Sequence, residues 1–132
     1  MSLKKNNNIF KDIKTLIEQT KQNVAIKVNS ALTLMYWQIG KYINSEILNN
    51  NRADYGKEIV QTLSEQLTKE YGKGYTKRNL ENMIKFAQTF PDIQIVHSLS
   101  AKLTWTHFKQ IIYIDKPLKR DFYIGMLKIE WS

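Results

Sequence analysis

The chain of 132 residues contains no cysteine. Disulfide bonds and thiolate metal sites are therefore excluded. A lack of disulfide bonds is typical of proteins in a reducing compartment, so we expect a cytoplasmic protein. The sequence also lacks any apolar run of about 18 residues, the length needed to span a membrane as a helix. Its N-terminus has no apolar signal-peptide segment. We therefore expect a soluble protein that does not interact with a membrane.

Acidic residues are scarce relative to basic ones. The chain has 12 Asp and Glu residues against 20 Lys and Arg residues, which gives a formal net charge of +8. Such an excess attracts polyanions, of which nucleic acid is the commonest in the cytoplasm. Only two prolines and five glycines interrupt the chain, and no segment alternates apolar and polar residues as a strand does. The sequence predicts one compact, all-α domain of several helices.

The N-terminal third of the chain is dominated by helical periodicity. Residues 1–8 are polar and predict a flexible arm, and residues 9–132 predict a single helical domain. Apolar residues recur at helical spacing over 9–17 and again over 24–48, the longest periodic segment. Gly40 lies within this segment at a cost of about 1 kcal/mol relative to alanine. We therefore expect another helix to approach closely there, and we expect Tyr36 and Trp37 to be core or interface anchors.

The centre of the sequence has the outline of a helix-turn-helix unit. A first amphipathic helix over 59–71 is broken by Gly72-Lys73-Gly74, where glycine can adopt the positive φ that ends a helix. Thr76 is then a good N-cap for a second helix. The apolar residues of that second helix, from Leu80 to Ala87, form its core face, and Pro91 ends it. A helix, a short turn and a capped helix together predict the unit.

The outward face of this second helix is rich in basic and amide side chains. In helix-turn-helix proteins the first residues of the second helix face base edges in the major groove. Arginine suits guanine there, asparagine suits adenine, and lysine neutralises phosphates. The predicted DNA-binding residues are Lys73, Lys77, Arg78, Asn79, Asn82 and Lys85. We expect Arg78, Asn82 and Lys85 to be exposed on one face. The alternative is an ordinary helical hairpin whose charges are only solvated.

A second, similar outline follows in the C-terminal third. Asp92 and Thr104 are expected N-caps, and apolar residues recur helically from Trp105 to Ile112. The outward residues of this second unit are a further candidate set for contacting DNA: Thr106, His107, Lys109 and Gln110. The segments 93–96 and 111–114 are rich in β-branched residues, which leaves a small wing hairpin as an alternative there.

Catalytic, metal and cofactor motifs are not evident. The Gly72-Lys73-Gly74 segment lacks the preceding strand and the Gly-Lys-Ser/Thr ending of a phosphate-binding loop. His97 and His107 have no acidic partner at metal-ligand spacing. Pro91-Asp92 looks like the start of a PD-(D/E)XK nuclease motif, but no Glu-x-Lys or Asp-x-Lys follows. We therefore expect no cofactor, no metal and no catalytic activity in this chain.

Several segments follow one another in a distinctive order. They are NSALTLMYWQIG (29–40), Tyr55-Gly56, YGKGYTKRNL (71–80) and LSAKLTWTHF (99–108), followed by IDKPL (114–118), Phe122-Tyr123 and Trp131-Ser132. In this order they resemble the N-terminal domain of YhcG-type proteins. The resemblance covers nearly the whole chain from about Lys14. It implies a helical domain of unknown function that precedes a PD-(D/E)XK nuclease domain. The catalytic residues of that nuclease domain would lie beyond Ser132.

These observations together predict a non-catalytic DNA-binding or targeting module of a nuclease. The expected partners are DNA and the C-terminal nuclease domain of a longer protein. The apolar residues at 129–131 also favour a longer protein of which this chain is one domain. The alternative is a protein-interaction module, including a homodimer, that uses the apolar stripe of 24–48 and the apolar C-terminal end.

Overall fold

The structure, a computed structural model, describes residues 3–50, 52 and 54–130. These residues form six helices and no strand, so the predicted all-α fold is confirmed. The helices are α1 (Leu3–Asn49), α2 (Tyr55–Tyr71), α3 (Lys77–Thr89), α4 (Ile93–Ser100), α5 (Trp105–Ile111) and α6 (Pro117–Glu130). No wing hairpin forms at the two β-branched segments, because 93–96 begins α4 and 111–114 is the end of α5 and the turn after it.

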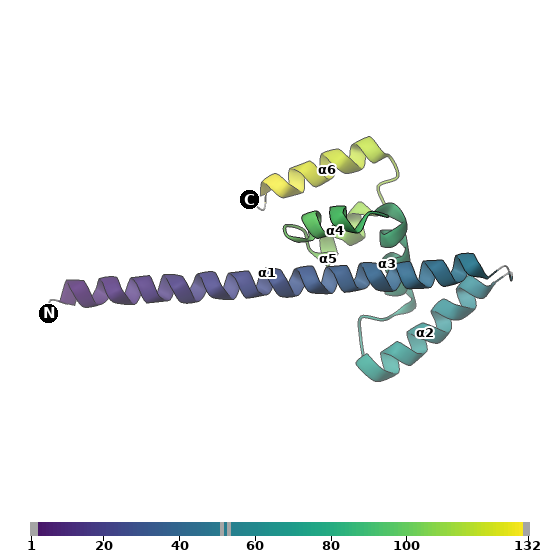
Figure 1. Cartoon of the computed structure of the whole chain (residues 1–132), viewed down its shortest axis with the longest axis horizontal. Coiled ribbons are helices and arrows are strands. Elements are labelled where there is room, and N and C mark those ends of the chain that lie inside the picture. Colours follow the sequence, from purple (N-terminus) through teal and green to yellow (C-terminus); the bar gives the residue numbers. More distant parts are fainter. Residues whose placement is uncertain (1–2, 51, 53, 131–132) are drawn as a thin grey trace.

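Helix α1 is far longer than the separate helices that the sequence predicted. It contains 47 residues, which corresponds to roughly 70 Å at 1.5 Å per residue. The segments 9–17 and 24–48 are parts of this one helix, and it begins at Leu3, inside the predicted arm, of which residues 1–2 lie outside the described residues. The other five helices gather around the C-terminal half of α1, and its N-terminal half projects beyond them (Figure 1).

Two clusters of buried side chains hold the helices together, and α3 contributes to both. The larger cluster joins α1 to α3, α4, α5 and α6, and the smaller one joins α1 to α2 and α3. The α3 side chains in these clusters are Leu80, Met83, Ile84, Phe86 and Ala87, as the sequence pattern predicted for most of them. Helix α3 is therefore the central helix of the fold rather than a surface helix.

The close approach predicted at Gly40 is confirmed. Gly40 is buried on α1 and faces the backbone of α3, where a Cβ atom would overlap with the carbonyl group of Met83. Trp37 is also buried, and its indole Nε1 donates a hydrogen bond to the carbonyl of Phe90 at 2.7 Å. The expected anchoring role of Trp37 is thus confirmed, and these two contacts fix α3 against α1.

The predicted N-caps are confirmed. The side chain of Thr76 accepts from the backbone N–H of Asn79, and Asp92 does the same for α4. Thr104 caps α5 in a reciprocal arrangement, in which the ring of His107 accepts from the Thr104 backbone N–H at 3.0 Å. Each cap satisfies a backbone donor that a helix N-terminus otherwise leaves without a partner.

We expect Thr76→Ala to lower the free energy of unfolding by about 1 kcal/mol, because the capping acceptor for α3 is lost. Thr62→Ala is the matched control, since Thr62 lies on the exposed face within α2 and caps no helix among the described residues. Urea denaturation of both variants measures the difference. Equal midpoints for the two variants would show that the Thr76 hydroxyl does not support α3.

Candidate nucleic-acid interface

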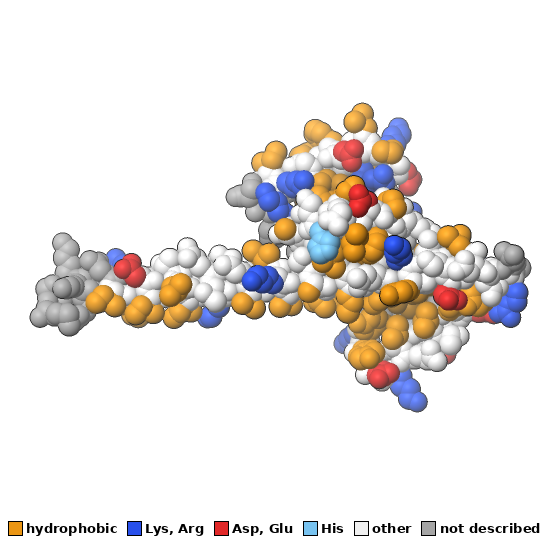
Figure 2. All heavy atoms as spheres, in the orientation of Figure 1, with side chains coloured by type: hydrophobic (Ala, Val, Ile, Leu, Met, Phe, Trp, Pro, Cys, Tyr) orange, Lys and Arg blue, Asp and Glu red, His pale blue; other side chains and the backbone are white. Residues whose placement is uncertain are grey.

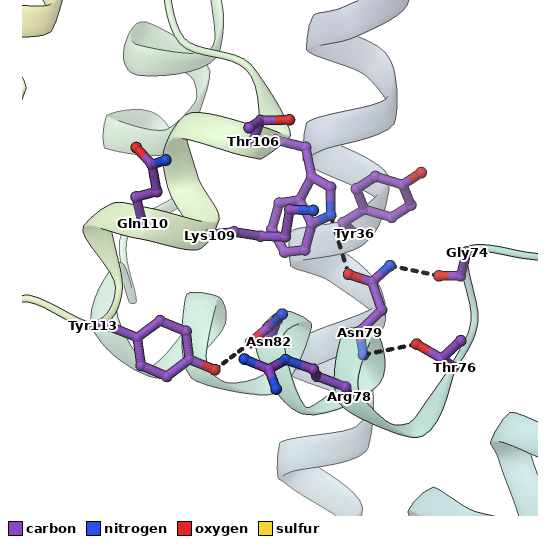
Figure 3. A pocket seen from close by; sticks show the side chains of 11 residues that line it. Tyr36, Gly74, Thr76, Arg78, Asn79, Asn82, Thr106, Lys109, Gln110 and Tyr113 are labelled. Carbon is purple, nitrogen blue, oxygen red and sulfur yellow. Dashed lines mark hydrogen bonds between the residues drawn. The ribbon is translucent and has the colours of Figure 1, made fainter.

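An open groove separates the N-terminal turn of α3 from α5. Its volume is about 940 Å³. The described residues that line it are Tyr36, Gly74, Thr76, Arg78, Asn79, Asn82, Trp105, Thr106, Lys109, Gln110 and Tyr113. Members of both predicted DNA-contacting sets therefore meet in one place, although the sequence placed them in two separate units (Figure 3).

Aromatic contacts beneath the groove hold α5 beside α3. The rings of Phe86 and Phe108 have centroids 4.6 Å apart, and the ring of Trp105 lies 5.4 Å from that of Phe86. Trp105 also packs against Tyr36 of α1, with ring centroids 5.1 Å apart. Because these side chains are wedged between three helices, the polar residues next to them on α3 and α5 border a groove of fixed width.

Two cationic side chains enter the groove from opposite sides. Arg78 extends from the first turn of α3 and Lys109 extends from α5, and both point into the space between the helices (Figure 3). No Asp or Glu is among the described residues that line the groove. In the described part of the chain the only ion pair joins Arg52 and Glu58, at 2.7 Å. The positive charge of the groove is therefore not compensated by an ion pair.

The prediction that Asn82 is exposed beside Arg78 and Lys85 is wrong. Asn82 is only 6% exposed, and its Oδ1 accepts a hydrogen bond from the hydroxyl of Tyr113. The turn after α5 covers this part of α3, which the spacing within α3 alone could not reveal. Asn82 therefore forms part of the groove floor and does not belong to a free outer face.

Asn79 is also engaged within the protein. Its Nδ2 donates to the carbonyl of Gly74, and its Oδ1 accepts from Trp105 Nε1 at 3.3 Å (Figure 3). These bonds connect the turn before α3 to the first residue of α5. Asn79 thus positions the walls of the groove relative to each other.

Thr106 and Gln110 also line the groove, whereas Lys73, Lys77, Lys85 and His107 do not. Lys73 and Lys77 are exposed near its α3 end, and Lys85 is half-buried with its ammonium 5.2 Å from the ring centroid of Tyr113. His107 turns back to the cap of α5, where its Nδ1 accepts from Thr104. Of the predicted cations, Arg78 and Lys109 therefore line the groove, and Lys73, Lys77 and Lys85 lie outside it.

The sequence pattern missed the three aromatic residues of the groove, which are Tyr36, Trp105 and Tyr113. Tyr36 was predicted to be a core or interface anchor; it packs against the smaller core cluster, and it also lines the groove. Burial raises the pKa of Tyr36 above its ordinary value of 10.0, and the nearby Tyr75 raises it further. The phenol consequently stays neutral at physiological pH and can donate a hydrogen bond. No local signal marks these residues, because they come together only through packing.

Comparison with known proteins identifies the family. Residues 12–132 match the DUF1016 N-terminal domain. The chain belongs to this family. A curated member, named "Putative nuclease YhcG", from Escherichia coli (strain K12), is 30% identical over 90 residues, which are 67% of this chain and 24% of that protein. The chain thus spans about a quarter of the length of its relative. No solved structure matches the chain.

The family assignment confirms the resemblance seen in the sequence. Two absences hold for the described residues, 3–50, 52 and 54–130. No group of three or more His, Asp or Glu side chains there could hold a metal ion. No helix there has the length and apolar character needed to cross a membrane.

Proposed function

We propose that the chain is a non-catalytic DNA-binding module of a nuclease of this family, and that it contacts DNA through the groove between α3 and α5. The observation that carries the proposal is the convergence of Arg78 and Lys109, without ion-pair partners, from two distant segments of the sequence. The relative's name supports the choice of ligand, because a nuclease acts on nucleic acid.

The neutral side chains of the groove suit the same ligand. The hydroxyl of Thr106 is exposed at its edge. Gln110 accepts a hydrogen bond from the Tyr123 hydroxyl at 3.0 Å through its Oε1, which leaves its amide N–H groups available as donors. Together with Arg78 and Lys109 they form a set rich in donors, and phosphate oxygens are acceptors only. Contacts of this kind position a protein on the nucleic-acid backbone.

The mode of contact that we propose differs from that of an exposed recognition helix. Six of the 13 residues of α3 are buried, including most of the stretch from Leu80 to Ala87, whereas its first turn lies at the groove between α3 and α5. That turn presents Lys77 and Arg78, and the capped N-terminus adds a partial positive charge. DNA would therefore meet the first turn of α3 and one face of α5, rather than receive the whole of α3 in its major groove.

Fluorescence anisotropy with a labelled duplex, titrated with salt, tests the proposal. We expect weak binding at low salt that falls steeply as salt is added, because each neutralised phosphate contributes about 0.9 to the log–log slope. Arg78→Ala combined with Lys109→Ala should weaken binding at least about tenfold and make the slope shallower by roughly two units.

The matched control is Lys57→Ala combined with Lys119→Ala. This pair removes the same number of positive charges as the groove pair, from exposed positions on α2 and α6 that do not line the groove. We expect it to change affinity much less than the groove pair. If both pairs weaken binding equally, the attraction depends only on net charge and the groove is not the interface. If the wild-type chain does not bind duplex DNA at tens of micromolar and low salt, the proposal fails.

A further inference from the structure

The projecting half of α1 carries an apolar stripe that the rest of the described chain does not cover. Six large side chains share one helical face there, and each is 48–64% exposed: Ile9, Ile13, Leu16, Ile17, Val24 and Val28. Figure 2 shows hydrophobic side chains, in orange, along one edge of the projecting half. Contiguous apolar surfaces of this kind mark interaction sites.

No other described part of the chain packs against this half of α1. Every residue from 9 to 28 is exposed. A single helix of this length is marginal in water, because helices in proteins are stabilised mainly by the packing of an apolar face. The opposite face is mainly polar, with Lys11, Glu18 and Gln22, and Ile26 is an isolated exposed apolar residue on it. The continuous apolar stripe is therefore on one side of the helix.

We propose that this stripe pairs with the same stripe of a second copy of the chain, in an antiparallel arrangement with two-fold symmetry. The spacing of five of the six apolar residues is self-complementary in one register, and Leu16, at the edge of the face, lies opposite Lys21 of the other copy. In that register Ile9 of one copy lies opposite Val28 of the other, and Ile13 lies opposite Val24. Two-fold symmetry repeats each of these contacts, so the stripe is covered along its whole length.

The stripe also contains the polar residues Thr20 and Lys27, and Thr20 lies at the centre of this register. Thr20 there lies opposite Ile17 of the other copy. The Thr20 hydroxyl already donates to the carbonyl of Leu16 at 2.9 Å. Because its polar group is satisfied within its own helix, Thr20 can present its methyl group to the partner without leaving a buried donor unpaired.

The position of α2 decides between the two orientations of the pair. The stripe continues along α1 to Ile39, Ile43 and Ile47, where α2 packs against it. In Figure 1, α2 lies on the same side of α1 as the uncovered stripe in Figure 2. A parallel partner helix would run on into α2. An antiparallel partner ends earlier, because its residue 3 lies opposite residue 34, before the segment that α2 covers.

Sedimentation of the full chain over a range of concentrations tests the proposal. The chain has a mass of 15.6 kDa, and we expect it to reach twice this mass as the concentration rises. Ile13→Glu combined with Ile17→Glu places two charges in each copy of the stripe and should raise the dissociation constant at least about 100-fold. The control, Gln19→Glu with Gln22→Glu, adds the same charge outside the stripe and should leave it within about threefold.

Disulfide trapping tests the orientation, and the absence of native cysteine makes it clean. Ile13→Cys and Val24→Cys, oxidised as a mixture, should yield a cross-linked pair of the two variants. Ile13→Cys alone should stay uncross-linked, because in this register the two copies of residue 13 lie roughly 16 Å apart along the axis. A chain that remains monomeric, a dimer that tolerates the Ile13 and Ile17 substitutions, or self-cross-linking of Ile13→Cys would each overturn the proposal.

Discussion

Gly40→Ala is expected to destabilise the folded chain by about 1–3 kcal/mol, although alanine favours a helix more than glycine does. The reason is the contact between α1 and α3. The new Cβ would overlap with the carbonyl group of Met83, which is part of a helix backbone and cannot rotate away as a side chain could. Either α1 and α3 separate or the helix bends, and both changes disturb the core clusters that contain Met83 and its neighbours.

Gly125→Ala is the control for this effect. Gly125 lies within α6, where a new Cβ would meet no atom within 4 Å. The gain in helix propensity then acts alone, and we expect the variant to be more stable by up to about 1 kcal/mol. Thermal or urea unfolding of both variants gives the comparison. If Gly40→Ala unfolds like Gly125→Ala, the close approach of α1 and α3 at Gly40 does not exist.

The parts of the fold that the sequence predicted are those governed by short-range chemistry. Thr76 and Thr104 could be identified as N-caps because a capping side chain bonds to a backbone N–H only three residues ahead. The core face of α3 followed from helical periodicity in the same way. Even Gly40 was interpretable, because a glycine inside a long helix implies a close neighbour, although its partner Met83 could not be named.

The parts that the sequence missed depend on contacts between distant segments. Asn82 has the spacing of an exposed residue, and only the hydroxyl of Tyr113, 31 residues later, makes it part of a buried contact. The groove likewise exists only because Trp105 docks between Tyr36 and Phe86. Arg78 and Lys109 were both predicted as candidates, but their meeting across one groove could not be derived from spacing within either helix.

The length of α1 was missed for a different reason. Lys21, Gln22 and Asn23 are polar and lie in the gap between the two apolar periodic segments, 9–17 and 24–48, from which separate helices were predicted. The projecting half packs against no other described part of the chain, so all of its faces are exposed. In the sequence, its helical pattern therefore comes only from the apolar stripe. The alternative of an interaction module used the stripe of 24–48. In the structure much of that stripe is covered by α2 and α3, and the uncovered part lies mainly N-terminal to it.

Trp37→Ala should lower the free energy of unfolding by about 3–5 kcal/mol, the second large effect that we expect. Trp37 is 3% exposed and packs in the larger core cluster with residues from α3, α4, α5 and α6. Its indole also donates to the carbonyl of Phe90, the C-cap residue of α3. The last carbonyl groups of a helix have no intrahelical donor, so the indole supplies one at a buried helix end.

Trp37→Phe separates the two contributions of the tryptophan. It keeps an aromatic ring in the cluster but leaves the Phe90 carbonyl without its donor, and we expect a cost of about 1–3 kcal/mol. Tyr42→Ala, at a position on α1 that is 76% exposed, should stay within about 0.5 kcal/mol of the wild type. If Trp37→Phe is as stable as the wild type, the hydrogen bond to Phe90 contributes nothing to the docking of α3.

The same variant distinguishes folding from binding. Trp37 is not among the residues that line the groove, so Trp37→Phe at low temperature should leave the DNA affinity of the folded chain unchanged. Arg78→Ala with Lys109→Ala should lower the DNA affinity and leave the free energy of unfolding nearly unchanged, because neither side chain belongs to a core cluster. Anisotropy titrations and urea unfolding of both variants provide the four measurements. If the Trp37 variant lost affinity while still folded, the groove would depend on how α3 ends at Phe90 as well as on how it begins at Thr76.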